Sequence, residues 1–259
     1  KETPIVWYFT AGSNTDFFDG TDWAAHEWDI AMRQAVAAAR YTECVQTGGT
    51  DCATAHPVYT GQMDDAWDAI SLAREVDDCR HGKAHKGKNC TTLADEIAAQ
   101  RGYTPGVVAI AKMREMVVLC HSPVEAGDPA ECGGPRLPAG MKSSQCVGDP
   151  RLLDEATRQT CQAALTVRMG DLRYHQVNSI SIPQTPSPWG IMVDANDPIS
   201  GEVVQASINI WTHVNDLASQ GVIDTARYIK GELKTSEVTD GKYVRDWVEA
   251  NKAAGGGSA

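Results

Sequence analysis

The stretch GIMVDANDPISGEVVQASINIW, residues 190–211, decides the fold class that this sequence predicts. Its two halves are separated by a turn at residues 197–201, where Pro198 fixes φ and Gly201 accepts a positive φ. The second half has one apolar face, made of Ala206, Ile208 and Ile210. The stretch therefore predicts two β-strands joined by a turn.

Two further segments predict strands of the same sheet. Residues 4–11, PIVWYFTA, are rich in β-branched and aromatic residues, and residues 171–182, DLRYHQVNSISI, alternate between polar and apolar residues. Residues 23–40 and 212–233 have apolar residues at helical spacing. We therefore expect an α+β fold in which a small mixed sheet packs on these helices.

The predicted helix at residues 23–40 has one apolar stripe, which we expect to face the core. His26 and Glu27 lie off this stripe in the first turn, where we expect solvated polar side chains. The stripe consists of Trp28, Met32, Ala35, Val36 and Ala39.

The stretch AAHEWDIAM, residues 24–32, begins like the helix of a zinc protease. Such a helix contains His-Glu-x-x-His, because histidines at i and i+4 lie on one helical face and the glutamate activates a zinc-bound water. Here the fifth position is Ile30. Asp29 could serve as an oxygen ligand, but the sequence points to no third ligand. We therefore predict that His26 binds no zinc and that this chain holds no metal ion.

Eight cysteines lie between Cys44 and Cys161, and both flanks contain none. An even, clustered set is typical of a disulfide framework, so we expect four disulfides and an oxidising compartment. The pairs Cys44–Cys52 and Cys79–Cys90 are expected, because each closes a short loop between predicted helices. Three pairings remain open for the other cysteines, which are Cys120, Cys132, Cys146 and Cys161.

Residues 41–165 alternate predicted helices with loops that contain the cysteines. Within this block, residues 104–120, TPGVVAIAKMREMVVLC, predict a single helix with Thr104 as its cap. We expect the block to form a helical, disulfide-rich insertion beside the sheet. The loop CRHGKAHKGKNC, residues 79–90, could also hold zinc, but its four cations and poor ligand spacing favour a disulfide-closed loop.

The chain contains 34 acidic and 23 basic residues, so its formal net charge is −11. Nucleic acid and anionic membranes favour a basic surface, so we expect neither as the main partner. No apolar run reaches the roughly 20 residues of a membrane-spanning helix, and the amino terminus lacks the pattern of a signal peptide. Together with the cysteines, this predicts a mature protein that is secreted or extracellular, in the periplasm or at the cell surface.

Around the hairpin, the sequence resembles secreted bacterial zinc-dependent metallopeptidases of the zincin type. Members of this group have an Asp-Leu-Arg-Tyr segment, a Ser-Pro-x-Gly segment and a DP-x-[ST]-GE hairpin, which match Asp171–Tyr174, Ser187–Gly190 and Asp197–Glu202. The resemblance extends more weakly to the first predicted strand and helix and to GKYVRDWVEAN, residues 241–251, and it covers roughly half of the chain. It implies a single zincin-like domain at residues 1–252, followed by a flexible tail at residues 253–259.

The resemblance also implies a role for the second strand of the hairpin. In zincins the edge strand of the main sheet borders the active-site cleft, and a substrate peptide adds to it through main-chain hydrogen bonds. The alternative is an ordinary strand with no ligand. By position, the substrate-binding strand would consist of Gln205, Ala206, Ser207, Ile208, Asn209, Ile210 and Trp211.

The chain departs from this family at the metal site. In the family, a His-Glu-x-x-His helix follows the hairpin, whereas here only His81 and His85 are spaced i, i+4, and Gly82 follows His81. The resemblance therefore implies part of a secreted zinc metallopeptidase that lacks the zinc-binding helix, has no catalytic residues and is inactive alone. Zinc would be a cofactor only if a downstream segment supplied its ligands. The partners would then be a peptide or protein substrate or that downstream segment.

A different class of function is also open. The chain could be a non-catalytic secreted module, binding or structural, that uses a zincin-like scaffold without the metal.

Overall fold

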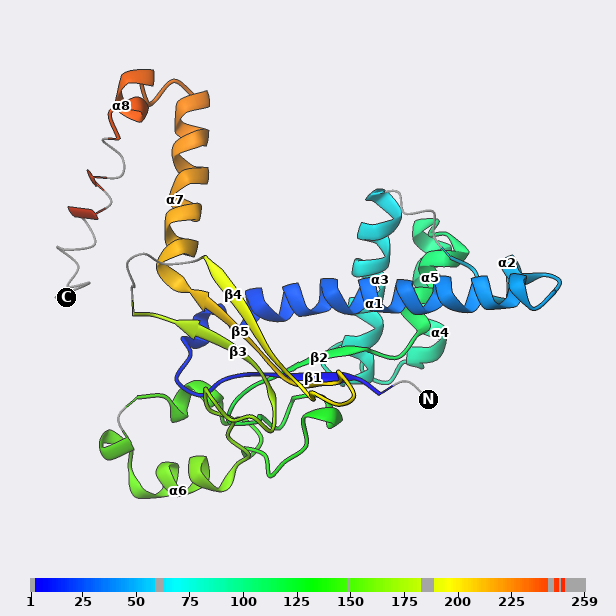
Figure 1. The fold of residues 1–259 in the computed structure, drawn as a ribbon, viewed down its shortest axis with the longest axis horizontal. Coiled ribbons are helices and arrows are strands. Elements are labelled where there is room, and N and C mark those ends of the chain that lie inside the picture. The colour runs from blue at the N-terminus through cyan, green and yellow to red at the C-terminus, as the bar shows by residue number, and fades with distance from the viewer. Residues whose placement is uncertain are drawn as a thin grey trace. The chain divides into compact units, whose positions relative to one another are not determined.

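The computed structural model describes residues 3–58, 63–148, 150–182, 189–241, 245–246 and 248–249. These residues form an α+β fold in which a mixed sheet is combined with helices (Figure 1). The sheet has five strands, and the fold contains four disulfides. The chain divides into two compact units, Lys1–Ser179 with Ile191–Asn209 and Ile180–Gly190 with Ile210–Ala259. No helix within the described ranges is both long enough and apolar enough to span a membrane.

The strand order of the sheet is β2-β1-β3-β5-β4. β1 (Ile5–Phe9) lies between β2 (Val117–Cys120) and β3 (His175–Ile180) and is parallel to both. β4 (Gly190–Asn196) and β5 (Val203–Trp211) form the predicted hairpin. The three segments expected to build the sheet therefore share it, which confirms the α+β prediction.

Residues 104–120 do not form the single helix that was predicted. α5 (Pro105–Lys112) ends at Met113, whose backbone is extended, and the chain continues into β2. Thr104 is the helix cap, as expected, because its side chain accepts a hydrogen bond from Val107 N (3.4 Å). The run Val117–Cys120 forms a strand because β-branched side chains pack well once the chain lies beside β1.

The helical block at residues 41–165 belongs to the same packed unit as the sheet. α3 (Met63–Arg80), α4 (Cys90–Arg101) and α5 bury a common apolar core with Ile30 and Ala37 of α1 (Phe18–Gln46). Figure 1 shows α3, α4 and α5 gathered along one stretch of α1. The block thus supplies an outer strand, β2, and the helices that pack on α1. Its core includes Ala69, Leu72, Ala73, Val76, Leu93, Ala94, Ile97, Val107, Ile110 and Ala111.

α1 presents the opposite side to the core from the one predicted. Trp28 of the predicted stripe is 64 % exposed and Met32 is 38 % exposed. The buried side contains Ile30 together with the polar residues His26 and Arg33. The expectations that the stripe faces the core and that His26 is solvated are therefore wrong. Hydrophobic periodicity could not reveal this, because the buried polar side chains depend on partners that lie far away in the sequence.

Each of the four disulfides closes a short loop. The two expected pairs, Cys44–Cys52 and Cys79–Cys90, are present. The other cysteines pair as Cys120–Cys132 and Cys146–Cys161, so every bridge joins cysteines that are consecutive along the chain. No described cysteine is free. This set of disulfides indicates an oxidising compartment.

The second unit contains α7 (Thr212–Ile229), which follows β5 directly, and α8 (Thr235–Thr239). Apolar side chains of α7 are exposed, with Val222 at 71 % and Ile229 at 78 %. The tail predicted at residues 253–259 lies outside the described residues. The remaining elements are α2 (Cys52–Ala55), α6 (Glu155–Ala163) and the 3-10 helices η1 (Thr15–Phe17), η2 (Ala130–Cys132), η3 (Ser143–Cys146) and η4 (Pro150–Leu152).

Candidate functional site

The structure places β4, and not β5, at the edge of the sheet. β5 lies between β3 and β4, so both of its edges are paired. The segment from Gln205 to Trp211, predicted as the edge strand, is therefore an inner strand, and the edge position is corrected to β4. Gln205, Ala206 and Trp211 are buried.

Polar side chains hold β5 against β3. The Asn178 amide nitrogen donates to Ser207 Oγ (2.9 Å) and Asn209 Oδ1 (3.0 Å). Ala206 N donates to His175 Nδ1 (3.0 Å). Burial lowers the pKa of His175, which favours the neutral ring that this contact needs. The polar side chains of Ser207 and Asn209 are therefore used in the pairing of β5 with β3.

β4 is exposed along its whole length. All seven residues of Gly190–Asn196 are exposed, and Ile191, Met192 and Val193 are 45 %, 61 % and 54 % exposed. Since successive side chains point to opposite faces, both faces of this strand are open. Its outer edge offers a row of N–H and C=O groups to which another extended segment can add.

The turn between β4 and β5 is held by its own hydrogen bonds. Asp197 Oδ1 accepts from Ile199 N (2.7 Å) and Ser200 N (3.0 Å), and these bonds lower the pKa of Asp197. Asp197 N donates to Glu202 O, and Gly201 N donates to Asp197 O, both at 2.8 Å. Gly201 has a φ of 74°. This left-handed conformation is one that glycine adopts without strain, so Gly201 suits the last position of the turn.

Within the AAHEWDIAM stretch, His26, Asp29 and Ile30 lie on the buried side of α1, and His26 and Asp29 are held there by polar contacts. His26 is 8 % exposed, and its Nε2 lies 2.9 Å from the carbonyl oxygen of Ile70, to which it donates. Asp29 Oδ1 accepts from Met116 N (2.5 Å) and Val117 N (3.0 Å). Asp29 therefore satisfies the backbone donors at the start of β2.

Arg33 is fully buried at the centre of this network. Its Nη2 lies 2.6 Å from Asp29 Oδ2 and 2.6 Å from Asp77 Oδ2. Its Nη1 donates to Met113 O (3.0 Å), and Arg80 pairs with the other oxygen of Asp77 (2.7 Å). Burial opposes the charge of Arg33, but the two carboxylates outweigh it and raise the pKa of the guanidinium. Arg33 thus ties α1 to α3 and to the end of α5.

Among the described residues, His26, Asp29 and Asp77 form the group whose ligand atoms lie close enough for a metal ion, within 4.8 Å of one another. This donor set does not fit zinc. Arg33 already contacts both carboxylates, and His26 Nε2 is bonded to a backbone carbonyl. A dication here would also be repelled by the buried guanidinium. We therefore derive no metal chemistry from this network, and the absence of zinc binding by His26 stays a prediction.

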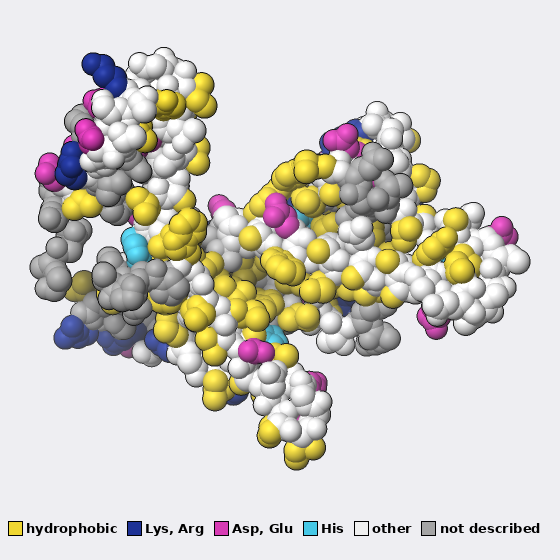
Figure 2. All heavy atoms as spheres, turned by 45° about the horizontal axis from the view of Figure 1, so that its top comes forward, with side chains coloured by type: hydrophobic (Ala, Val, Ile, Leu, Met, Phe, Trp, Pro, Cys, Tyr) yellow, Lys and Arg dark blue, Asp and Glu magenta, His cyan; other side chains and the backbone are white. Residues whose placement is uncertain are grey.

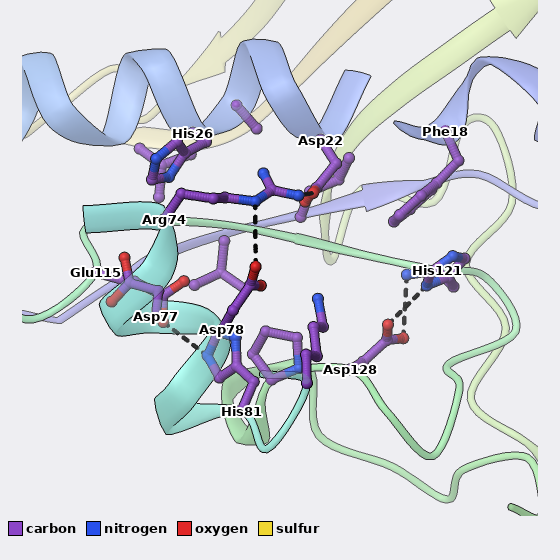
Figure 3. A pocket seen from close by; sticks show the side chains of 16 residues that line it. Phe18, Asp22, His26, Arg74, Asp77, Asp78, His81, Glu115, His121 and Asp128 are labelled. Atoms are coloured by element: carbon purple, nitrogen blue, oxygen red, sulfur yellow. Dashed lines mark hydrogen bonds and ion pairs between the residues drawn. The ribbon is translucent and has the colours of Figure 1, made fainter. Parts of the chain in front are cut away.

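A small cavity of about 50 Å³ lies between α1, α3 and the outer side of β2 (Figure 3). His26, His81 and His121 come to it from different elements. His121 Nδ1 donates to Asp128 Oδ1 (2.6 Å), and the His121 ring stacks on Phe18 with centroids 3.5 Å apart. The space holds about one or two water molecules. We assign no ligand to it, because its histidines are engaged by the protein itself.

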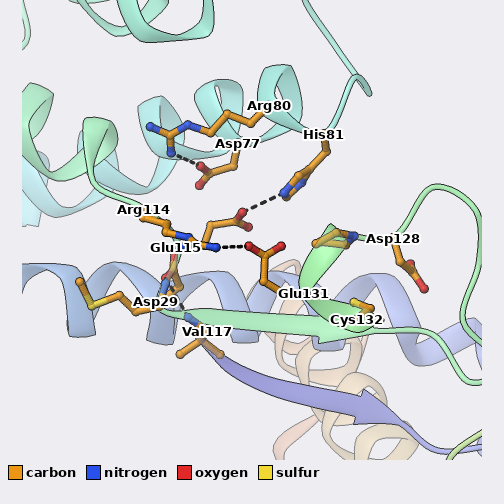
Figure 4. Close-up of polar contacts among 12 residues, drawn as sticks. Asp29, Asp77, Arg80, His81, Arg114, Glu115, Val117, Asp128, Glu131 and Cys132 are labelled. Atoms are coloured by element: carbon orange, nitrogen blue, oxygen red, sulfur yellow. Dashed lines mark hydrogen bonds and ion pairs between the residues drawn. The ribbon is translucent and has the colours of Figure 1, made fainter. Parts of the chain in front are cut away.

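His81 pairs with Glu115 beside this cavity, with Nε2 and Oε2 2.8 Å apart (Figure 4). Burial alone would lower the pKa of His81, but the hydrogen bond and charge of Glu115 outweigh burial and raise it. The pair fastens the end of α3 to the segment that leads into β2.

Sequence reasoning missed this network for a physical reason. Asp29 and Arg33 are spaced i, i+4, which is the one local signal that they share a helix face. Their partners Asp77 and Glu115 lie on other elements, and no local pattern connects them to α1.

No family model, curated protein or solved structure matches this chain. A function therefore has to be proposed from the motifs and the geometry.

Proposed function

We propose that this chain is part of a secreted zinc metallopeptidase that hydrolyses peptide bonds, with the zinc ligands supplied by a downstream segment. The chain provides the sheet and its open edge strand, and it is inactive alone. The buried network of His26, Asp29, Arg33 and Asp77 takes no part in holding zinc. The observation that carries the proposal is the exposed strand β4, which adjoins the DP-x-[ST]-GE turn at Asp197–Glu202.

The position of β4 suits a strand that receives a peptide. It is the last strand of the sheet, and its outer edge is unpaired among the described residues. Two of its own residues, Ile191 and Val193, are apolar and exposed. Natural proteins usually protect a long apolar edge, because it invites pairing with another chain. Leaving β4 open is consistent with a strand that binds an extended substrate.

Exposed apolar side chains on α1 and β5 support the proposal that a further segment of the polypeptide packs on this chain. Trp28 and Met32 point outward from α1, and Val203 and Val204 near the turn are 48 % and 60 % exposed. Figure 2 shows hydrophobic side chains gathered across the middle of one view of the molecule. Apolar surface of this kind commonly marks a contact with another segment or partner. A downstream segment that contains the zinc helix would cover part of it.

The disulfides support the secreted part of the proposal. Four bridges within Cys44–Cys161 are typical of a protein in an oxidising compartment. A peptidase released from the cell works under that condition.

The test compares the 259-residue chain with a polypeptide extended through the first downstream His-Glu-x-x-His segment. Zinc is measured by elemental analysis, and cleavage is assayed on an unfolded protein substrate. We expect the extended polypeptide to bind about one zinc ion per chain and to lose activity with a chelator, whereas the shorter chain does neither.

The matched control replaces the downstream motif glutamate with glutamine in the extended polypeptide. This variant should keep its zinc and lose cleavage, because the glutamate activates the zinc-bound water. An extended polypeptide that folds with its disulfides but retains no zinc and cleaves nothing would contradict the proposal. That outcome would favour the non-catalytic secreted module.

A further inference from the structure

A second cavity, of about 280 Å³, lies at the carboxyl ends of the parallel strands β1 and β2. Ala11 and Gly12 follow β1 and line it, and Pro123 follows β2 and lines it as well. The carboxyl ends of parallel strands are where open sheets most often bind ligands. The volume is near the lower end of the roughly 300–1,000 Å³ that small-molecule sites occupy.

The walls of this cavity are fixed by the protein itself. Ala11 N donates to Val167 O (2.9 Å), and Ala11 forms an isolated parallel bridge with Arg168. Ser122 Oγ donates to Val167 O (2.7 Å) and accepts from Val167 N (2.6 Å). The disulfide Cys146–Cys161 forms another part of the wall. A preformed cavity loses little conformational entropy when a ligand binds.

The lining is positively charged in a chain whose net charge is −11. Arg158 and Arg168 line the cavity, and none of the described residues that line it is acidic. Arg158 pairs with Glu155, which is not part of the lining. The Arg168 side chain has no ion pair or hydrogen bond with a described residue. Among the residues that the structure describes, no carboxylate therefore compensates the charge of Arg168 at the cavity.

The rest of the lining separates into apolar and hydrogen-bonding parts. Pro123, Val147 and Leu153 supply apolar surface, and Gln162 and Thr166 supply polar groups. A ligand that satisfies both parts must combine an apolar body with a charged end.

We infer that this cavity, the arginine cavity, binds a small organic monocarboxylate with an apolar body. The carboxylate pairs with Arg168, because a planar guanidinium matches a carboxylate through two parallel hydrogen bonds. The apolar body lies against Pro123, Val147 and Leu153. A single guanidinium without a described carboxylate partner favours a monoanion over a phosphate ester, which has nearly two negative charges at neutral pH.

The experiment titrates the disulfide-bonded 259-residue chain with benzoate and follows its backbone amide NMR signals. We expect the signals of Ala11, Gly12 and Arg168 to shift in a saturable way. Benzyl alcohol, which keeps the ring and lacks the charge, should bind at least about tenfold more weakly, because a hydrogen bond to a charged group is the stronger one.

Arg168→Gln should weaken benzoate binding at least about tenfold, and Arg158→Gln should weaken it less. Arg173→Gln is the matched control, because Arg173 pairs with Asp171 away from the cavity and should leave the affinity unchanged. The amide spectrum of each variant shows whether it has folded.

Three results would overturn the inference. The first is no saturable shift with benzoate up to concentrations on the order of 10 mM, where even weak sites respond. The second is equal affinity in folded Arg168→Gln. The third is tighter binding of phenyl phosphate than of benzoate, which would assign the cavity to a dianion.

Discussion

At the scale of single residues, Arg33 shows how a buried charge organises this protein. Its guanidinium bridges Asp29 on α1 and Asp77 on α3, and all three residues are buried. We expect Arg33→Met to lower the free energy of unfolding by about 3–5 kcal/mol, because it leaves the buried carboxylates of Asp29 and Asp77 without the guanidinium that bridges them. Arg74→Met is the control, since the Arg74–Asp22 pair is partly exposed and should contribute at most about 1 kcal/mol. Urea denaturation with the disulfides intact measures both, and equal losses would contradict the role given to Arg33.

His81 gives a second prediction at this scale. Its pKa is raised above the ordinary value of 6.5 by Glu115, so the folded state binds the proton more tightly than the unfolded state. The stability that the pair contributes is therefore fully present below pH 6.5 and is lost as the pH rises through the folded pKa. The difference in unfolding free energy between the native protein and His81→Gln should shrink over that range. Glu115→Gln should remove the same pH-dependent part, and identical pH profiles in all three proteins would contradict the pairing.

At the scale of elements, α1 has a polar network on its buried side and apolar residues on its exposed side. Ile30→Ala removes a side chain that is 2 % exposed and should cost about 2–5 kcal/mol of unfolding free energy. Met32→Ala, two positions away, should change it by no more than about 0.5 kcal/mol, because Met32 is 38 % exposed. Thermal or urea unfolding of the two variants compares these sides directly. A larger loss of unfolding free energy for Met32→Ala than for Ile30→Ala would contradict this assignment and would favour the face that hydrophobic periodicity predicts.

The elements also show how far sequence reasoning reaches. The strands at residues 4–11 and 171–182, the hairpin and the cap at Thr104 follow from local rules, and the structure contains them. β2 was missed because residues 117–120 become a strand only beside β1, which is more than a hundred residues away. The edge position was assigned to the wrong strand of the hairpin, because β5 pairs with β3, a contact between separate segments that includes the hydrogen bonds of Asn178 to Ser207 and Asn209. The arginine cavity could not be predicted from the sequence, because its lining comes from four separate segments of the chain that only the fold brings together.

At the scale of the whole molecule, the account centres on β4 as an open edge to which a substrate peptide adds. The most direct measurement is amide hydrogen exchange in the peptide that covers Gly190–Asn196. It is made on the extended polypeptide whose downstream motif glutamate is replaced with glutamine, with and without an unfolded protein substrate. We expect β4 to exchange quickly without the substrate and at least about tenfold more slowly with it, with the rates of β1 equal in both. Equal exchange of β4 with and without the substrate would contradict the claim that this edge of the sheet receives a substrate peptide.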